Sequence, residues 1–403
     1  MKRVLFITES CFPVIGAENI VNARLLAVLT NSGNFQIDVI TKKKKWQNYP
    51  SDSLDEYGIK LNSLNLLEVD NKVNLTTIWQ HLLSLFKFGV VHKGDHWAYK
   101  AVSVAMNLIK SNEYDYVLTR AQPSHLVGFY LKKKYGIKWV CTWNDPYPSE
   151  MYPLPFGKGI NSVMRLKYHK SINIMRQADV FVYPNKRLAD YINSFLKSPE
   201  ESIRIIPHVM MQKPKQARKK IGNLVKLIHS GDCTGTRSAK KMIQAIKELK
   251  DNNLLCSQDF QLTFLGRINE KDKEYVKCSG IGDIVSVMEP VSYLNSLKIL
   301  ESFDVAVIIE APWKEGVFLP TKVSDFMMEG KRIFAISPEN GHLHDLYNEG
   351  FLSYYANTEN VDSIKNEILK LLKDYKEDNW NDYNVIVPQQ YFSDFAISQY
   401  SSL

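Results

Sequence analysis

Two glycines and a cluster of cations in the second half of the chain could bind a diphosphate. The stretch 230–237 reads Ser-Gly-Asp-Cys-Thr-Gly-Thr-Arg, and Lys240 and Lys241 follow it at the start of an expected helix. Gly231 allows backbone N–H groups to approach an anion, while Arg237 at the loop–helix junction adds a cation. The alternative for Lys240 is an exposed helix face that binds no ligand.

A second pair of chemical groups lies further along the chain. Lys322 and Asp325 are three residues apart near the start of an expected helix, so they share a face. A lysine there can neutralise phosphate, and a carboxylate can accept hydrogen bonds from both ribose hydroxyls. The alternative is a surface ion pair, which would contribute little to stability.

Near the N-terminus, the loop 12–16 ends in a glycine at the start of a helix. Gly16 would bring backbone N–H groups close to an anion or a sugar hydroxyl. The loop lacks the three-glycine dinucleotide fingerprint, so a turn without a ligand is the alternative.

The elements that must position these loops are short apolar runs alternating with helical patterns. Continuous apolar runs are typical of parallel strands covered on both faces. They predict an α/β fold with two facing Rossmann-like domains and ligands in an interdomain cleft, at the carboxyl ends of the strands. The expected strands are 4–8, 35–40, 116–119, 139–143, 180–183, 203–206, 224–228, 261–265, 285–288, 305–309 and 332–336. The expected helices are 19–30, 126–135, 186–195, 239–249, 293–300, 322–328, 361–375 and 392–400.

A basic, proline-containing stretch at 212–220 indicates a surface linker near the domain boundary. We expect an N-terminal acceptor domain over 1–205 and a C-terminal donor domain over 206–388. The final helix, from about 389 to 403, is expected to pack back on the first domain.

Composition limits the possible functions. The 403 residues are 45% hydrophobic and 23% charged, which excludes a disordered chain or a coiled coil. The formal charge of +8 suits an anionic ligand or an acidic lipid surface and falls short of a nucleic-acid signature. Five cysteines without a CxxC pair fit a reducing cytoplasm. The absence of an Asp-x-Asp pair argues against a catalytic metal.

Several segments, in this order, resemble the hallmark motifs of retaining GT-B glycosyltransferases. In that family a proline precedes Lys-x-x-Glu-Tyr and a Gly-Lys-Pro turn; here the matching residues are Pro320, Lys322, Asp325, Phe326 and the Gly-Lys-Arg of 330–332. The loop 12–16, the segments 123–126 and 139–147, the turn 206–209 and the loop 231–237 match further family motifs. The resemblance extends over nearly the whole chain.

The resemblance implies a donor that is a nucleotide-diphosphate sugar such as a UDP- or GDP-sugar, with no cofactor and no metal. Arg237 and Lys322 would hold the diphosphate and stabilise it as it leaves, and Asp325 would bind the ribose. The Gly16 loop would meet phosphate or acceptor. Residues 266–267, beginning with Gly266, and the stretch 287–293 would line the base pocket.

Asp145 would face the acceptor, which the resemblance implies is a saccharide or a lipid-linked sugar of surface polysaccharide synthesis. Retaining relatives are thought to let the acceptor attack from the leaving-group face, so a dedicated base is not required. If a base exists, Asp145 and His125 are candidates, although His125 also fits a packed histidine at a helix start.

The sequence departs from the family in places. Many relatives carry two glutamates separated by seven residues; Asp325 matches the second, Val317 stands at the first, and Glu310 and Glu315 are out of register. Asn144 stands where an arginine is usual, and 208–209 read His-Val in place of Asn-Gly. Two alternatives therefore stay open, a nucleotide-sugar 2-epimerase of the same fold and a catalytically inactive partner subunit.

Two aromatic and basic segments suggest contact with an anionic membrane. Residues 42–45 are lysines followed by Trp46 and Tyr49, and the apolar stretch 75–88 contains Trp79 and is flanked by Lys72 and Lys87. The alternatives are a solvated loop and an ordinary core helix. We expect a cytoplasmic protein, with peripheral contact at the inner face of the plasma membrane.

Overall fold

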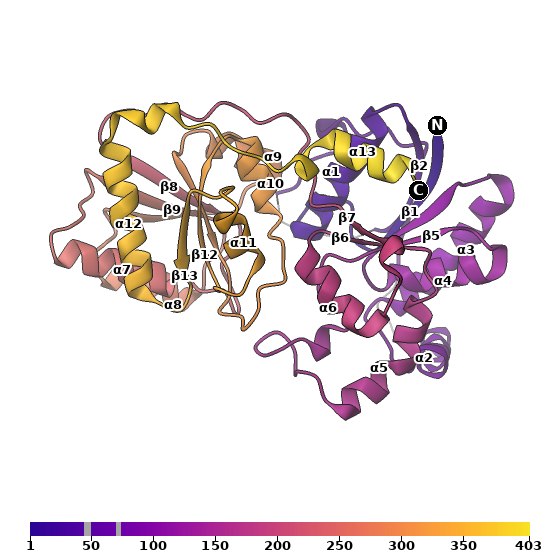
Figure 1. Ribbon diagram of the computed structural model, residues 1–403. Helices are drawn as coiled ribbons and strands as arrows, with labels where there is room; N and C mark the ends of the chain where they lie inside the picture. The colour runs from indigo at the N-terminus through magenta and orange to yellow at the C-terminus, as the bar shows by residue number, and fades with distance from the viewer. Residues whose placement is uncertain (44–49, 70–73) are drawn as a thin grey trace. The chain divides into compact units, whose positions relative to one another are not determined.

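The computed structural model describes residues 1–43, 50–69 and 74–403, which form two compact units (Figure 1). Unit 1 comprises Met1–Met211 and Gln390–Leu403, and unit 2 comprises Gln212–Gln389. The boundary between the units therefore lies a few residues after the expected one at 205. The reason is local, because the Met210 N–H donates to the Tyr391 carbonyl at 2.9 Å and keeps this segment in unit 1.

Unit 1 is built on a parallel sheet. Its strands are β1 (Lys2–Thr8), β2 (Phe35–Lys42), β3 (Ser63–Leu67), β4 (Tyr116–Arg120), β5 (Trp139–Thr142), β6 (Val180–Tyr183) and β7 (Ile203–Ile205). Their order across the sheet is β3-β2-β1-β4-β5-β6-β7, and neighbouring strands pair in parallel. From β1 the chain adds strands first toward one edge of the sheet and then, from β4 on, toward the other. The point between β1 and β4 where the strand order reverses is the switch point at which such folds place ligands.

Helices cover both faces of this sheet (Figure 1). They are α1 (Ala17–Asn31), α2 (Leu75–Phe88), α3 (Asp95–Ser111), α4 (Ser124–Tyr135), α5 (Ser162–Met175), α6 (Lys186–Leu196) and α13 (Ser393–Ser401). Helix α13 packs beside α1, and the Tyr116 hydroxyl donates to the Tyr400 carbonyl at 3.1 Å. None of the helices that the structure describes is both long enough and apolar enough to cross a membrane.

Unit 2 repeats the design with a second parallel sheet. Its strands are β8 (Val225–Ser230), β9 (Phe260–Leu265), β10 (Val285–Met288), β11 (Val305–Ile309), β12 (Arg332–Ser337) and β13 (Tyr354–Asn357), in the order β10-β9-β8-β11-β12-β13. Here the switch point lies between β8 and β11. The loops that follow these two strands therefore emerge side by side.

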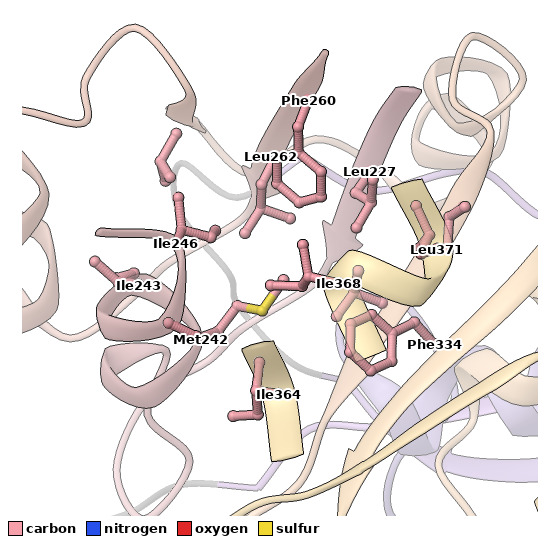
Figure 2. Packing of buried hydrophobic residues seen from close by; sticks show 14 of the residues in the cluster. Leu227, Met242, Ile243, Ile246, Phe260, Leu262, Phe334, Ile364, Ile368 and Leu371 are labelled. Atoms are coloured by element: carbon pink, nitrogen blue, oxygen red, sulfur yellow. The ribbon is translucent and has the colours of Figure 1, made fainter. Parts of the chain in front are cut away.

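The core of unit 2 fixes those strand ends. Its helices are α7 (Lys240–Asp251), α8 (Glu270–Cys278), α9 (Tyr293–Leu300), α10 (Lys322–Met328), α11 (His342–Asn348) and α12 (Val361–Lys376). Helices α7 and α12 cover one face of the sheet, and Figure 2 shows their apolar side chains directed at Leu227, Leu262 and Phe334. Ile364, Ile368 and Leu371 recur at the spacing of one helix face and are fully buried. Truncating such a side chain to alanine typically lowers the free energy of unfolding by about 2–5 kcal/mol. This packing therefore holds the strands, and the loops at their ends, in place.

Candidate functional site

The carboxyl edge of the second sheet brings two predicted loops together. Gly231 directly follows β8, and Lys322 begins α10. A Cβ added to Gly231 would lie 3.0 Å from both Cε and Nζ of Lys322. The lysine side chain therefore rests on the glycine backbone, with its ammonium at the end of β8.

Gly266 completes this seat. It follows β9 with a φ of +133°, and an added Cβ would lie 2.8 Å from the backbone C and O of Gly231. Gly231 itself has a φ of +102° and donates its N–H to the Leu265 carbonyl at 2.7 Å. Both positions therefore require glycine, for conformation and for the close approach of two backbones.

His229 orients the lysine. Its Nδ1 lies 3.1 Å from the Val307 carbonyl oxygen, which can only accept, so Nδ1 is the donor. Nε2 is then free to accept from the Lys322 ammonium at 3.3 Å. Burial, followed by the charge of Lys322, holds the pKa of His229 well below its usual value, so the ring stays neutral. The sequence-based prediction missed His229, although a histidine near the end of an apolar strand, just before a glycine loop, was a usable signal.

Arg237 shares the electrostatic environment of this cluster. Burial, followed by the positive charge of Arg237, lowers the pKa of Lys322 to about 8. The same guanidinium acts on His229 and Glu310. Arg237 is exposed, and its backbone is held by the Asn269 amide, which donates to the Arg237 carbonyl at 2.9 Å. Two cations that the sequence singled out thus lie at one sheet edge, and an anion would relieve their mutual repulsion.

Asp325 is buried beneath the start of α10. It is 6% exposed, and the Tyr293 hydroxyl of α9 donates to its Oδ1 at 2.6 Å. Burial and Arg237 lower the pKa of Lys322, and the negative charge of Asp325 partly opposes that lowering. The arrangement differs from the exposed Lys–Asp surface pair that the sequence left as an alternative.

Glu310 is a further acidic group at this edge. It follows β11, is 3% exposed, and its Oε2 has no hydrogen-bond partner among the described residues. Burial raises the pKa of Glu310 to about 7, against the lowering effect of Arg237. Val317, at the family position of the first glutamate, is fully buried and apolar. In the sequence, Glu310 is out of register with the two glutamates of the family motif. Its place directly after the buried strand β11 nevertheless puts it at the carboxyl end of the sheet, beside the other site residues.

Other predicted positions lie at the margin of the cluster. The Lys240 side chain is exposed, and the Lys241 ammonium donates to the Glu359 carbonyl at 2.6 Å. The start of α7 is capped internally, because Asp272 Oδ2 accepts from the Ala239 N–H and the Ser238 hydroxyl, each at 2.9 Å. An anion at this helix end would compete with that carboxylate.

The neighbourhood of Gly266 is set by an ion pair. Arg267 donates its backbone N–H and its Nε to the Asp232 carboxylate, each at 3.1 Å. Burial opposes ionisation of Asp232, but these hydrogen bonds outweigh it and lower the carboxyl pKa. The pair ties the loop after β8 to the loop after β9.

Unit 1 holds the predicted acceptor-side residues. Gly16 is the N-cap residue just before α1, with a φ of +90°, and an added Cβ would meet no atom within 4 Å, so the space around it is open. Asp145 is exposed after β5. Its neighbour Asn144 donates to Glu18 of α1 at 2.7 Å, which joins the loop after β5 to the helix after β1.

His125, the other candidate base, is a core residue. It is fully buried, its Nδ1 lies 2.9 Å from the Thr119 hydroxyl, and its ring lies 4.2 Å from that of Trp143. Burial holds its pKa well below the usual value. Such a histidine is positioned to pack, as the alternative interpretation held. Within the part of the chain that the structure describes, no three His, Cys, Asp or Glu side chains are grouped so that they could hold a metal ion.

The chain has two α/β units, and each contains a parallel sheet whose strand order reverses at one point. This is the arrangement of the GT-B fold, and solved structures share it. HepE of Anabaena, in complex with UDP, aligns with a TM-score of 0.63 at 12% identity, covering 100% of this chain and 99% of that one. WaaG, a glycosyltransferase of lipopolysaccharide biosynthesis, gives 0.56 at 12% identity over 99% and 95%. A putative UDP-N-acetylglucosamine 2-epimerase of Listeria monocytogenes gives 0.56 at 14% identity over 99% and 94%.

The chain has the GT-B fold, as the sequence predicted. Residues 77–209, within unit 1, match the sequence pattern of Glycosyltransferase Family 4. No curated protein matches the chain.

Proposed function

We propose that this chain is a glycosyltransferase that moves a sugar from a nucleotide-diphosphate sugar to a saccharide or lipid-linked acceptor. The observation that carries the proposal is the Lys322 ammonium, seated on Gly231 and held by His229 in the field of Arg237. The similar fold of HepE, solved with UDP, supports a uridine nucleotide donor. The similar fold of WaaG supports a role in surface polysaccharide synthesis.

The chemistry follows from where charge develops. Cleaving the anomeric C–O bond places negative charge on the departing diphosphate and positive charge on the sugar. Lys322 is held by Gly231 and His229 before the reaction and Arg237 adds a second positive charge nearby, so the two cations would stabilise the leaving group as its charge develops. We propose that transfer proceeds without a metal ion and with retention of configuration. We also propose that the Glu310 carboxylate accepts a hydrogen bond from a hydroxyl of the donor sugar.

The direct test is to incubate the protein with UDP-sugars in EDTA and to measure free UDP, the intact nucleotide sugar and glycosylated acceptor. UDP should also raise the unfolding temperature, because a ligand that binds only the folded state stabilises it. We expect UDP release without added metal. A strict requirement for Mn²⁺ or Mg²⁺ would contradict the metal-free mechanism.

The same assay separates the alternatives. A 2-epimerase, the activity named for the Listeria structure of this fold, would release a free epimer of the sugar, which is identified by also analysing the free sugar in the same reaction. An inactive partner subunit would bind UDP without turnover, or would not bind it.

The affinity for UDP should depend on pH through Lys322. The pKa of this ammonium in the ligand-free protein is about 8, below its ordinary value of 10.5, so it loses its proton as pH rises through about 8. UDP binds the charged form, and its affinity should therefore fall by roughly tenfold per pH unit above about 8, until the higher pKa of the complex is reached. Titration calorimetry at a series of pH values measures this.

Lys322→Arg provides the control for that pH dependence. A guanidinium stays charged throughout the range, so the variant should show a flat profile even if its affinity is lower. A wild-type affinity that does not change between about pH 7 and 9 would place the diphosphate elsewhere.

The location of the protein is part of the proposal. We propose a cytoplasmic enzyme that meets its acceptor at the inner face of the plasma membrane. The predicted lysines 44–45, with Trp46 and Tyr49, lie outside the described residues, as does Lys72. Lys42 and Lys43 form ion pairs with Glu9 and Glu68, so they are partly neutralised.

A further inference from the structure

Helix α2 is packed with a mostly polar side inward, which also buries Phe88 near its end. Thr77 and Ser84 are buried, the Ser84 hydroxyl lies 3.3 Å from that of Tyr99, and Gln80 contacts the His96 ring of α3. A helix that belongs to a protein core does the reverse and buries its apolar stripe. The alternative interpretation of 75–88 as an ordinary core helix is therefore wrong, because most of its large apolar side chains are not buried.

The apolar face of α2 points away from the protein. At about 100° per residue its large side chains fall within an arc of about 120°. Leu75 is 85% exposed and Phe86 76%, and the other four side chains are between 47% and 61% exposed. The set is Leu75, Ile78, Trp79, Leu82, Leu85 and Phe86.

Helix α5 extends this face. Val163 and Leu166 are exposed, the latter to 81%, and they share a helix face with Lys170. The Lys170 ammonium donates to the Phe86 carbonyl at 3.1 Å and lies 5.5 Å from the centre of the Phe86 ring, which joins the two helices. Figure 1 shows α2 and α5 at the same end of unit 1. The segment that leads into α5 also exposes Leu154, Phe156 and Ile160.

The charges carried by the two segments of this surface have one sign. The helix 75–88 and the segment 152–175 contain no aspartate or glutamate. Their exposed cations are Lys87, Lys158, Arg165, Lys167 and Lys170, of which Lys167 is paired with Glu150. An apolar stripe with a cationic rim suits a bilayer that carries anionic headgroups, where apolar side chains enter the acyl boundary and lysines reach the phosphates.

We propose that the exposed faces of α2 and α5, here the α2–α5 surface, dock the protein on an anionic lipid bilayer with both helices lying along the membrane plane. A two-fold contact between copies of this chain would set lysine against lysine across the interface, which disfavours a second copy as the occupant. The proposal deepens the membrane contact given above by naming its residues and its ligand. It does not depend on the activity of the donor site.

The test uses the whole protein and vesicles of phosphatidylcholine with or without phosphatidylglycerol, followed by sedimentation. The wild type should bind the anionic vesicles. The triple variant Trp79→Ser, Leu82→Ser, Leu85→Ser should lose at least about tenfold in partition, because apolar area no longer enters the bilayer. The matched control, Ile221→Ser, Leu254→Ser, Ile386→Ser, removes three exposed apolar side chains from unit 2 and should bind as the wild type does.

A charge variant checks the second half of the argument. Arg165→Gln and Lys170→Gln should each weaken binding to anionic vesicles by about fivefold at low salt, while binding to neutral vesicles stays unchanged. A wild type that ignores both kinds of vesicle would overturn the proposal. So would a dimer in lipid-free buffer that the triple variant converts to monomer.

Stabilisation by UDP separates this proposal from the proposed function. Both triple variants should keep the wild-type shift in unfolding temperature, since their substitutions are exposed and lie outside the diphosphate cluster. Vesicle binding without any UDP shift would remove the donor-site assignment and leave the docking surface intact.

Discussion

Replacing Arg237 or Lys322 by alanine is expected to lower kcat by about 10²–10³, the loss observed when one preorganised donor to a developing anion is removed. Both groups act on charge that grows as the diphosphate leaves, so kcat should fall more than the affinity for UDP. Lys322 has a defined seat on Gly231 and a partner in His229, which fixes its position before the reaction.

The experiment compares transfer and donor hydrolysis in four proteins: the wild type, the two single variants and the double variant. If the two cations share one leaving group, the double variant should depart from the sum of the singles. Lys277→Ala is the matched control, because it removes an exposed lysine from α8. Full activity in both single variants would remove the diphosphate assignment. Equal losses of kcat in Arg237→Ala, Lys322→Ala and Lys277→Ala would indicate a general effect of the protein's net charge.

The strands that the sequence predicted are mostly apolar, and they include every central strand of both sheets together with the edge strands β7 and β10. The two that it missed lie at the edges. Strand β3 reads Ser-Leu-Asn-Leu-Leu and β13 reads Tyr-Tyr-Ala-Asn, and both are only partly buried. An edge strand is covered by neighbours on fewer sides, so its composition carries a weaker signal.

The cations of the candidate site were predictable because each follows a strand in a loop with glycine. Their grouping could not be derived from spacing, since His229 and Lys322 are brought together by the parallel pairing of β8 with β11. Glu310 was judged by its register to a family motif, whereas its position depends on where β11 ends.

Helix α2 shows a different limit of sequence interpretation. The sequence identified 75–88 only as an apolar stretch, with a core helix as the alternative; the segment is a helix, but its sequence does not say which side faces the protein. That choice is made by α3, whose His96 and Tyr99 offer polar partners to Gln80 and Ser84. The hydrophobic pattern of a helix therefore indicates that one face needs to be covered. The tertiary structure determines whether the protein's own core or an outside partner covers that face.

Asp325→Asn is expected to weaken UDP binding by about 1.5–3 kcal/mol, the loss typical of a hydrogen bond to a charged group. The substitution preserves the shape of the side chain, and the asparagine oxygen can still accept from the Tyr293 hydroxyl, which lies 2.6 Å from Oδ1. The fold should therefore remain intact, and the change in affinity should report on the carboxylate charge alone. Titration calorimetry with UDP measures it, alongside Tyr293→Phe, which keeps the charge and removes the supporting hydrogen bond.

The decisive comparison uses a second ligand, the dideoxy analogue of UDP that lacks both ribose hydroxyls. If Asp325 binds the ribose, the wild type should prefer UDP to the analogue, and Asp325→Asn should lose most of that preference while binding the analogue nearly as the wild type does. Tyr293→Phe should show a smaller loss of the same kind, because it frees the carboxylate without neutralising it. Equal weakening of UDP and the analogue in Asp325→Asn would mean that the carboxylate acts through Lys322, whose pKa it raises, and that the ribose is bound by other residues.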